Sequence, residues 1–242
     1  MESKVIYTCL TGAYDALPQP LVTSGDWRFV CFTDNPSADG GVWEMRPIPR
    51  QDTPAAASRL PKLLPHEFLQ DFEVSLYIDS NIRITGEAFY SAALAAASSG
   101  ALWAGVPHPG RDCIYEENLS CYLSGLSRWG DAFRLKRRLQ QEGFPRHAGL
   151  LENNLILRRH LAPEVMETDK LWWEAYRNGI RRDQLHLMPL LAKAGIEPLA
   201  LLPEGRNARS FDSLEVLPHS RPAPSPHPRP RIVKSILKNT LK

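Results

Sequence analysis

The sequence predicts an α/β protein whose sheet is mostly parallel and flanked by helices. Short apolar runs alternate with helical patterns through the first half of the chain, and strands separated by helices favour a parallel sheet. The chain has 242 residues, of which 43% are hydrophobic and 23% charged, so it can bury a sizeable core. These values exclude a mostly disordered or fibrous protein.

Each expected element follows from its pattern of apolar residues. The strands are expected at residues 5–10, 27–33, 42–46, 74–79, 101–106 and 155–157. The helices are expected at residues 55–69, 89–98, 112–124, 131–142, 163–178 and 183–194. Pro61 and Pro65 must lie near helix ends or break the first helix. Gly179 and Gly195 are stop signals for the last two.

Composition and charge change near the C-terminus. Residues 219–242 contain six Lys or Arg and no Asp or Glu, with a proline at every second position from 222 to 230. Residues 1–218 carry 23 basic and 27 acidic residues, a net charge of −4, which does not indicate a partner made of nucleic acid. We therefore expect a single domain over residues 1–218 and a mobile, basic, Pro-rich tail over residues 219–242.

The tail ends in residues 232–242, where apolar residues recur at helical spacing with lysines between them. Such a segment can contact an anionic membrane surface, but a short segment makes a poor free helix. A disordered tail with chance periodicity is the alternative. No run of eighteen apolar residues and no secretory signal is found, so we expect a cytoplasmic protein, with the inner face of the membrane as a second possibility.

The cysteines indicate the same compartment. Cys9, Cys31, Cys113 and Cys121 form no Cys-x-x-Cys pair, which predicts reduced thiols in a cytosolic protein. Cys9 and Cys31 lie inside apolar runs and are expected in the core.

Several common catalytic motifs are absent from the sequence. There is no GxxxxGK[ST], no GxGxxG after a strand, no GxSxG and no HExxH. Their absence excludes the commonest nucleotide hydrolases, dinucleotide enzymes, esterases and zinc proteases. Enzymes that assemble a site from strand ends are not excluded.

Asp79, Ser80 and Asn81 follow the clearest apolar strand. Such a strand brings a carboxylate to the carboxyl edge of the sheet, where open α/β folds bind ligands. An Asp-x-Asp at this place can hold Mg²⁺ or Mn²⁺ against a diphosphate, and Asn81 is a weaker, neutral ligand. A simple Asp-Ser-Asn turn is the alternative.

A second polar cluster lies between a strand and a helix and contains His108, Arg111, Asp112 and Glu116. Asp112 as a helix N-cap and Glu116 as a first-turn charge would explain two of these residues. That alternative does not require His108 and Arg111, which a resemblance described below would place at the sugar or acceptor.

Two further polar clusters lie at expected element ends. Asn153 and Asn154 precede an apolar strand, where a turn is the alternative. Asp183 and Gln184 follow two arginines, where an N-cap with solvated arginines is the alternative.

These motifs occur in an order that resembles a known family. The chain contains, in order, Leu60-Pro61-Lys62, Tyr77-Ile78-Asp79-Ser80-Asn81, His108-Pro109-Gly110-Arg111-Asp112, Glu152-Asn153-Asn154 and Arg182-Asp183-Gln184. The order, over about residues 5–219, resembles the glycosyltransferase-like domain of plant mucilage-related and pollen-turgor proteins and their bacterial homologues. That domain was formerly catalogued as one of unknown function.

The resemblance implies a GT-A fold, Rossmann-like in its sheet, and transfer of a sugar from a nucleotide-sugar to an acceptor. We expect a UDP-sugar as donor and a glycan or lipid-linked acceptor. Asp79 then matches the first member of the metal-binding Asp-x-Asp motif for Mn²⁺ or Mg²⁺, from which Asn81 departs. This departure leaves the metal requirement open.

A looser resemblance to the retaining family 8 glycosyltransferases implies further roles. Asn153 or Asn154 would touch the donor sugar, and Asp183, in an Asp-Gln pair with Gln184, would lie near the reacting carbon. His219 would be a late ligand of the metal or the diphosphate.

The chemistry of the reaction suggests other candidates. The departing diphosphate needs a cation, either a metal on Asp79 or the side chains of Lys62, Arg59 and Arg221. Inversion also needs a carboxylate that deprotonates the acceptor, for which Asp112, Glu116 and Asp183 are candidates. The sequence does not choose between retention and inversion.

The ends of the first two strands suggest contacts with the nucleotide. Thr11 and Gly12 end the first strand, where Gly12 permits close approach of a backbone, and Tyr14 can stack on a base or be an ordinary surface aromatic residue. Asp34 ends the second strand and can accept a hydrogen bond from a base or ribose.

Two functions of other classes remain open. One is a metal-assisted hydrolase built on the same scaffold. The other is a non-catalytic module that binds a nucleotide or sugar, for which Asn81 is the best support.

Overall fold

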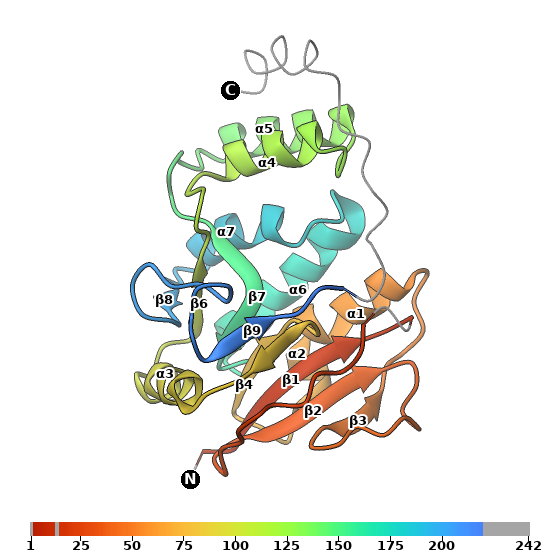
Figure 1. The fold of residues 1–242 in the computed structure, drawn as a ribbon. Coiled ribbons are helices and arrows are strands. Elements are labelled where there is room, and N and C mark those ends of the chain that lie inside the picture. Colours follow the sequence, from red (N-terminus) through yellow and green to blue (C-terminus); the bar gives the residue numbers. More distant parts are fainter. Residues whose placement is uncertain (1, 13–14, 220–242) are drawn as a thin grey trace.

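The computed structural model describes residues 2–12 and 15–219 and contains a seven-stranded sheet with helices on both faces (Figure 1). The strands are β1 (Lys4–Leu10), β2 (Arg28–Thr33), β3 (Glu44–Pro47), β4 (Val74–Ile78), β5 (Ile82–Ile84), β6 (Trp103–Pro107), β7 (Leu151–Arg158), β8 (Leu199–Ala200) and β9 (Leu214–Val216). The helices are α1 (Pro54–Leu63), α2 (Pro65–Phe68), α3 (Glu87–Ser98), α4 (Ile114–Leu123), α5 (Trp129–Gln141), α6 (Pro163–Asn178) and α7 (Gln184–Lys193). Tyr14, Arg221 and the segment 232–242 lie outside the described residues.

The order of strands across the large sheet is β3-β2-β1-β4-β7-β6-β8. All neighbouring pairs are parallel except the two that β7 makes with β4 and β6. β5 and β9 pair separately as a small antiparallel sheet. This arrangement confirms the predicted α/β class with a mostly parallel sheet.

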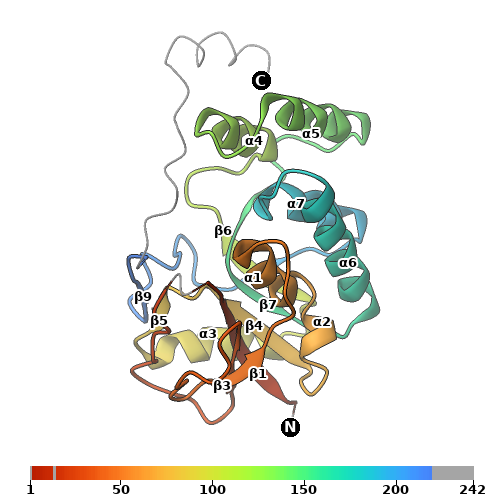
Figure 2. The same cartoon turned by 90° about the vertical axis from the view of Figure 1, so that its right-hand side faces the viewer.

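Side chains alternate between two cores on the opposite faces of the sheet. On β1, Val5, Tyr7 and Cys9 join the core that contains residues of α1, α6 and α7, whereas Ile6 joins the core that contains residues of α3. Figure 2 shows α3 on one side of the sheet and α1, α2, α6 and α7 on the other. The strands β1, β2 and β4 are buried on both faces over most of their length, which explains why their sequences are nearly continuous apolar runs.

The strand order reverses at β1. The chain passes from β1 to β2 and β3 on one side, and then places β4 on the other side of β1. In an open α/β sheet this reversal leaves a crevice beyond the carboxyl ends of the two central strands, where ligands bind.

Several expected boundaries differ from the observed ones. The helix expected at 55–69 is divided at Leu64, because Pro65 starts a new helix and lacks an amide to continue the first. β7 begins at Leu151, so the Glu-Asn-Asn sequence lies within a strand and not in a turn. Asp112 is not the N-cap of α4, which is Cys113. The strands β5, β8 and β9 were not predicted.

The four cysteines are free and buried, as expected for reduced thiols. Burial raises the pKa of the Cys31 thiol to about 12. Among the described residues, no helix is both long enough and apolar enough to cross a membrane.

Candidate functional site

A cavity of about 560 Å³ opens at the reversal of strand order, beyond the carboxyl ends of β1 and β4. The segments that line it are the end of β1, the start of α1, the end of β4 and single residues from two later segments. The lining residues are Cys9, Leu10, Thr11, Gly12, Asp15, Pro54, Ala55, Ser58, Arg59, Tyr77, Asp79, Ser80, Asn81, Arg182 and His219. The cavity therefore brings together candidates that are far apart in the sequence.

A buried ammonium group connects two of the candidate carboxylates. Lys62 Nζ lies 2.9 Å from Asp183 Oδ2 and 3.6 Å from Asp79 Oδ1, and the Lys62 side chain is only 2% exposed. It also lies over the ring of Tyr77, 4.6 Å from the centroid. Because a buried charge needs compensation, Lys62 and the two carboxylates act as one electrostatic unit.

Arg59 lies one turn before Lys62 on the same face of α1. Its Nε is 3.4 Å from Asp183 Oδ2. Burial lowers the pKa of Arg59, but the negative charges of Asp183 and Asp79 more than offset this and hold its pKa above the ordinary value. Arg59 lines the cavity whereas Lys62 does not.

Asp183 is the N-cap of α7, and its Oδ1 accepts a hydrogen bond from Gln184 N at 3.0 Å. Burial alone would raise the pKa of the Asp183 carboxyl, but Lys62 and Arg59 hold that pKa well below its ordinary value. Asp183 is therefore ionised at neutral pH. Asp183 can therefore be both a helix N-cap and a residue of the site. Its Oδ1 accepts from the α7 backbone, whereas its Oδ2 pairs with Lys62 and Arg59.

Asp79 faces the cavity from the end of β4. Its Oδ1 accepts a hydrogen bond from the Tyr77 hydroxyl at 2.8 Å, and its side chain is 37% exposed. Asn81, two residues later, uses its amide nitrogen to donate to Leu217 O at 2.9 Å, and Leu217 N donates back to Asn81 O. Asn81 therefore ties the segment after β9 to the edge of the cavity.

The residues around Asp79 fit a divalent metal poorly. His219 Nδ1 lies 3.1 Å from Asp15 Oδ2, which also accepts from the Ser80 hydroxyl. Within the described part of the chain, neither Asp79 nor His219 belongs to a group of three His, Cys, Asp or Glu side chains whose ligand atoms converge. The ammonium of Lys62 already compensates charge at Asp79, and it would repel a second cation there.

Gly12 lies where β1 leaves the sheet, with a φ of 67°. A Cβ at this position would lie 3.0 Å from Pro54 Cβ, so that a side chain would be strained by the backbone conformation and crowded by Pro54. The Thr11 hydroxyl donates to Pro54 O at 2.8 Å, and Asp34 Oδ2 accepts from Gly12 N at 2.8 Å. Asp34 thus supports the loop and does not line the cavity.

Asn153 and Asn154 lie beside Asp79, because Asn154 O accepts a hydrogen bond from Asp79 N at 2.9 Å. They occupy an irregular part of β7 opposite Gly105 and Val106. Both polar side-chain atoms of Asn153 are buried and make no hydrogen bond with a described residue. Gln184 donates to Leu151 O at 2.8 Å, so it positions β7. These three side chains do not line the cavity.

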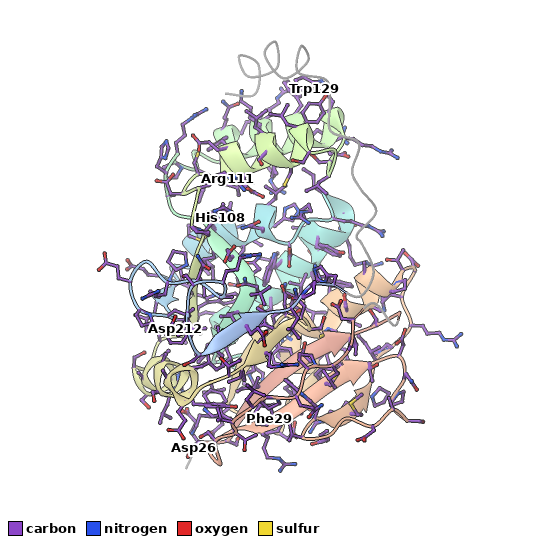
Figure 3. The ribbon with its side chains drawn as sticks, in the orientation of Figure 1. Asp26, Phe29, His108, Arg111, Trp129 and Asp212 are labelled. Atoms are coloured by element: carbon purple, nitrogen blue, oxygen red, sulfur yellow. The ribbon has the colours of Figure 1, made fainter. Side chains whose placement is uncertain are left out.

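The candidates from the loop before α4 lie elsewhere in the molecule. His108 Nδ1 accepts from the backbone amides of Gly110 and Arg111, and burial and Arg111 lower the pKa of His108. Arg111 pairs with Glu117 at 2.6 Å. Figure 3 labels His108 and Arg111 near the layer that contains α4 and α5.

Asp112 and Glu116 do not line the cavity either. Asp112 pairs with His147 at 2.7 Å, and Glu116 lies in the first turn of α4. Of the candidate carboxylates for catalysis, only Asp183 contacts a side chain of the cavity wall, namely Arg59.

Sequence reasoning missed Arg182, Asp15 and Ser80 as residues of the cavity. A solvated Arg182 was the alternative to a site at Asp183, but its Nε is buried and its side chain interacts with the Cys121 thiol. A charged residue directly before a helix N-cap was the available signal. It was too common a pattern to single out.

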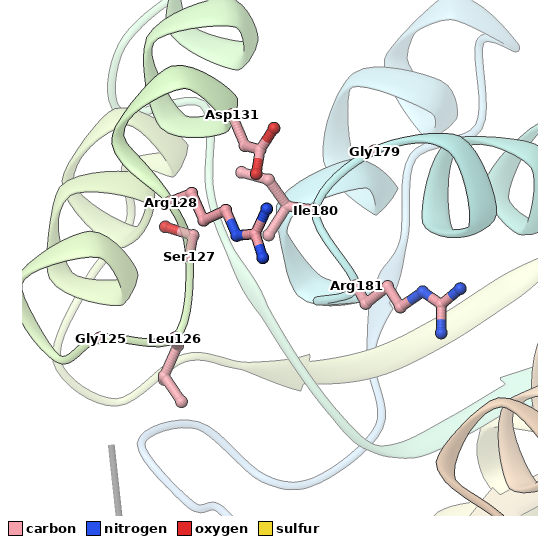
Figure 4. Close-up of a pocket in the computed structure, with 8 residues that line it drawn as sticks. All are labelled: Gly125, Leu126, Ser127, Arg128, Asp131, Gly179, Ile180 and Arg181. Atoms are coloured by element: carbon pink, nitrogen blue, oxygen red, sulfur yellow. The ribbon is translucent and has the colours of Figure 1, made fainter. Parts of the chain in front are cut away.

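A second hollow, also of about 560 Å³, lies between the α4–α5 connection and the turn after α6 (Figure 4). Arg128 and Asp131 line it from one wall, and Ile180 and Arg181 from the other; the Arg181 side chain extends away from the other labelled residues (Figure 4). Arg181 and Arg182 are adjacent in the chain but line different hollows.

Comparisons with known proteins identify no family. No family model matches the chain, and no curated protein matches it. Among solved structures, the apo structure of the bifunctional glycosyltransferase WbbM is similar, with a TM-score of 0.46 and 9% sequence identity. The match covers 84% of this chain and 39% of that one, so this chain spans about two fifths of its length.

Proposed function

We propose that this chain is a glycosyltransferase that moves a sugar from a nucleotide-sugar, expected to be a UDP-sugar, to a glycan or lipid-linked acceptor. The observation that carries the proposal is the cavity at the reversal of strand order, with Arg59 and Arg182 in its wall and ionised Asp183 paired with Arg59. Arginine side chains at such a crevice suit an anionic, phosphate-bearing ligand.

Arg59 and Arg182 would receive the diphosphate. A departing nucleoside diphosphate gains negative charge, and a prepositioned guanidinium stabilises that charge in the transition state. Lys62 is too deeply buried to line the cavity, so we assign it to holding Asp79 and Asp183 in place.

Asp183 would act on the sugar from behind the cavity wall, because it pairs with Arg59 but does not itself line the cavity. A sugar that loses its diphosphate develops positive charge, which an ionised carboxylate can stabilise. Because its pKa is low, Asp183 would stay ionised and suits this role better than that of a general acid. We derive no step through a divalent metal, because the residues around Asp79 fit one poorly.

The two adjacent arginines provide a test with a matched control. We expect UDP or a UDP-sugar to raise the melting temperature of the full chain, since a ligand that binds only the folded state stabilises it. Arg182→Gln should abolish the rise, and Arg181→Gln should retain it, because only Arg182 lines the cavity. GDP, CDP and their sugars are screened in parallel, and no rise with any nucleotide would refute the proposal.

A second variant tests the metal. Asn81→Asp restores the Asp-x-Asp spacing but replaces the amide that donates to Leu217 O by a carboxylate. We expect it to lower the free energy of unfolding by about 0.5–1.5 kcal/mol, the net contribution of the half-buried hydrogen bond that is lost, and Mn²⁺ to leave that loss unrepaired. Urea unfolding with Mn²⁺ and with EDTA measures both effects, and full recovery by Mn²⁺ would show a metal site here.

The binding-module alternative has one observation in its favour, the structural use of Asn81 in place of a metal ligand. A binding module would bind the nucleotide-sugar without cleaving it, whereas a transferase would release the nucleotide. Release of UDP from a UDP-sugar in the presence of acceptor glycans, lost in Asp183→Asn, would support the transferase. Binding without release, in both proteins, would support the module.

A further inference from the structure

Three metal-binding side chains converge away from the cavity, at the N-terminus of α4. The thiol of Cys113, the carboxylate of Glu116 and a ring nitrogen of His147 all lie within 4.8 Å of one another. Cys113 is the N-cap of α4, Glu116 is in its first turn, and His147 belongs to the connection between α5 and β7. The function proposed above uses none of these side chains.

The chemistry of the donors selects the ion. A thiolate, an imidazole and a carboxylate are the ligands that Zn²⁺ takes in proteins, usually at the corners of a tetrahedron. Mg²⁺ and Ca²⁺ prefer sets made only of oxygens, so a buried thiol argues against them. Glu116 and His147 are exposed, which leaves the ion a path from solvent.

The surroundings of the cluster also fit a metal centre. Asp112 Oδ1 lies 2.7 Å from His147 Nδ1, and a carboxylate that binds one ring nitrogen of a histidine orients the other toward a metal. Cys113 is fully buried at the N-cap position of α4, at the closed side of the cluster. Binding would release the thiol proton to solvent.

The connection that carries His147 is already held on α4. The Tyr115 hydroxyl donates to Phe144 O at 2.7 Å, and the Arg146 guanidinium lies 5.3 Å from the centroid of the Tyr115 ring. His147 itself has a φ of 55°, the only positive φ among the described residues other than glycine. These contacts present the ring to α4 before any ion arrives.

We propose that Cys113, Glu116 and His147 form a Zn²⁺ site that clamps the α5–β7 connection to the N-terminus of α4, with Asp112 orienting His147. A water molecule would complete the tetrahedron. The proposal gives Asp112 and Glu116, expected from the sequence to act in catalysis, a structural role independent of the transferase.

Cobalt provides the direct test. The full chain is first dialysed against EDTA and then titrated with Co²⁺. One Co²⁺ ion should bind per chain, and the complex should show a thiolate-to-cobalt charge-transfer band. Zn²⁺ should displace it. Cys113→Ser should lose the band. Glu116→Gln should weaken Co²⁺ binding by more than about tenfold, because removing even a residue that only hydrogen-bonds a metal ligand weakens binding about tenfold.

The control is Cys121→Ser, which alters another buried cysteine of the same helix and should keep both the band and the affinity. If Cys113→Ser does not fold, His147→Asn and Asp112→Asn change exposed side chains, and asparagine tolerates a positive φ. Asp112→Asn should weaken binding about tenfold and His147→Asn should weaken it further. A wild-type chain without the band, or a band unchanged in Cys113→Ser or His147→Asn, would overturn the site.

Discussion

Lys62 shows how a single residue can organise the site. Its ammonium is almost fully buried and lies between Asp183 and Asp79. Such an ion pair adds little net stability when the whole pair is replaced, but removing one partner leaves a buried charge uncompensated. The loss of folding stability should therefore be large when Lys62 alone is changed.

Lys62→Met tests this at nearly constant side-chain volume. We expect the free energy of unfolding to fall by about 3–5 kcal/mol, because Asp183 and Asp79 lose their shared cation. Lys193→Met is the control, since Lys193 also lies in the last turn of its helix but is exposed, and it should cost less than about 1 kcal/mol. Urea denaturation measures both, and similar losses in the two variants would contradict the role of burial.

Asp183 should make stability depend on pH in one direction. Its folded-state pKa is depressed by Lys62 and Arg59, so its contribution is complete above the unfolded pKa of about 3.9. The contribution is lost as the pH falls from there through the lower folded pKa.

Comparing the wild type with Asp183→Asn isolates this effect. We expect the wild type to be more stable at pH 6, and the difference to shrink as the pH falls below about 4. The measurement is the free energy of unfolding by urea at several pH values. A difference that grows toward acid pH would mean that the carboxylate is not held ionised.

The junction of β1 and α1 is the element on which the site depends. α1 begins with the Thr53 hydroxyl accepting from Ala56 N at 3.1 Å, and Pro54 O accepts from Thr11. Arg59 and Lys62 then project from one face of the helix. The loop after β1 thereby fixes where both cations lie.

Gly12→Ala should lower the free energy of unfolding by more than the strain of a positive φ alone would. Gly100 also has a positive φ, but a Cβ there would meet nothing within 4 Å, whereas at Gly12 it would meet Pro54 at 3.0 Å. We expect Gly12→Ala to cost at least about 1 kcal/mol more than Gly100→Ala. Thermal unfolding of the two variants gives the comparison, and equal losses would show that Pro54 yields to the added methyl group.

At the scale of the whole molecule, the cavity joins segments that only the sheet brings together. β1, β4 and the turn before α7 meet at one end of the sheet, whereas α4 and α5 form a separate layer beyond α7 (Figure 1). A ligand in the cavity should therefore slow amide hydrogen exchange in the segments that line the cavity more than in α4 and α5.

Hydrogen exchange with and without UDP measures this. We expect bound UDP to slow exchange at residues 10–12, 78–81 and 180–183 together, and to leave α5 unchanged, because α5 does not line the cavity. Protection confined to α4, α5 and residues 179–181 would instead place the nucleotide in the second hollow.

The sequence by itself determined the α/β class and most of the elements. Buried parallel strands are continuous apolar runs, and amphipathic helices repeat their apolar residues every three or four positions, so both patterns are local. Asp79 at a strand end and Asp183 at a helix start were found for the same reason. The small strands β5, β8 and β9 were missed because a segment of two or three residues is too short to show a periodic pattern of apolar side chains.

Only the tertiary structure decided which polar clusters share a site. Lys62 and Arg59 meet Asp79 and Asp183 because β4 lies beside β1 and the start of α7 packs against α1, contacts between segments distant in the chain. Asp112 and Glu116 have equally suggestive spacing, yet they lie before and within the first turn of α4, in another layer and beside His147. Spacing along the chain reports local geometry, whereas the grouping of charges depends on how layers pack, which no local pattern encodes.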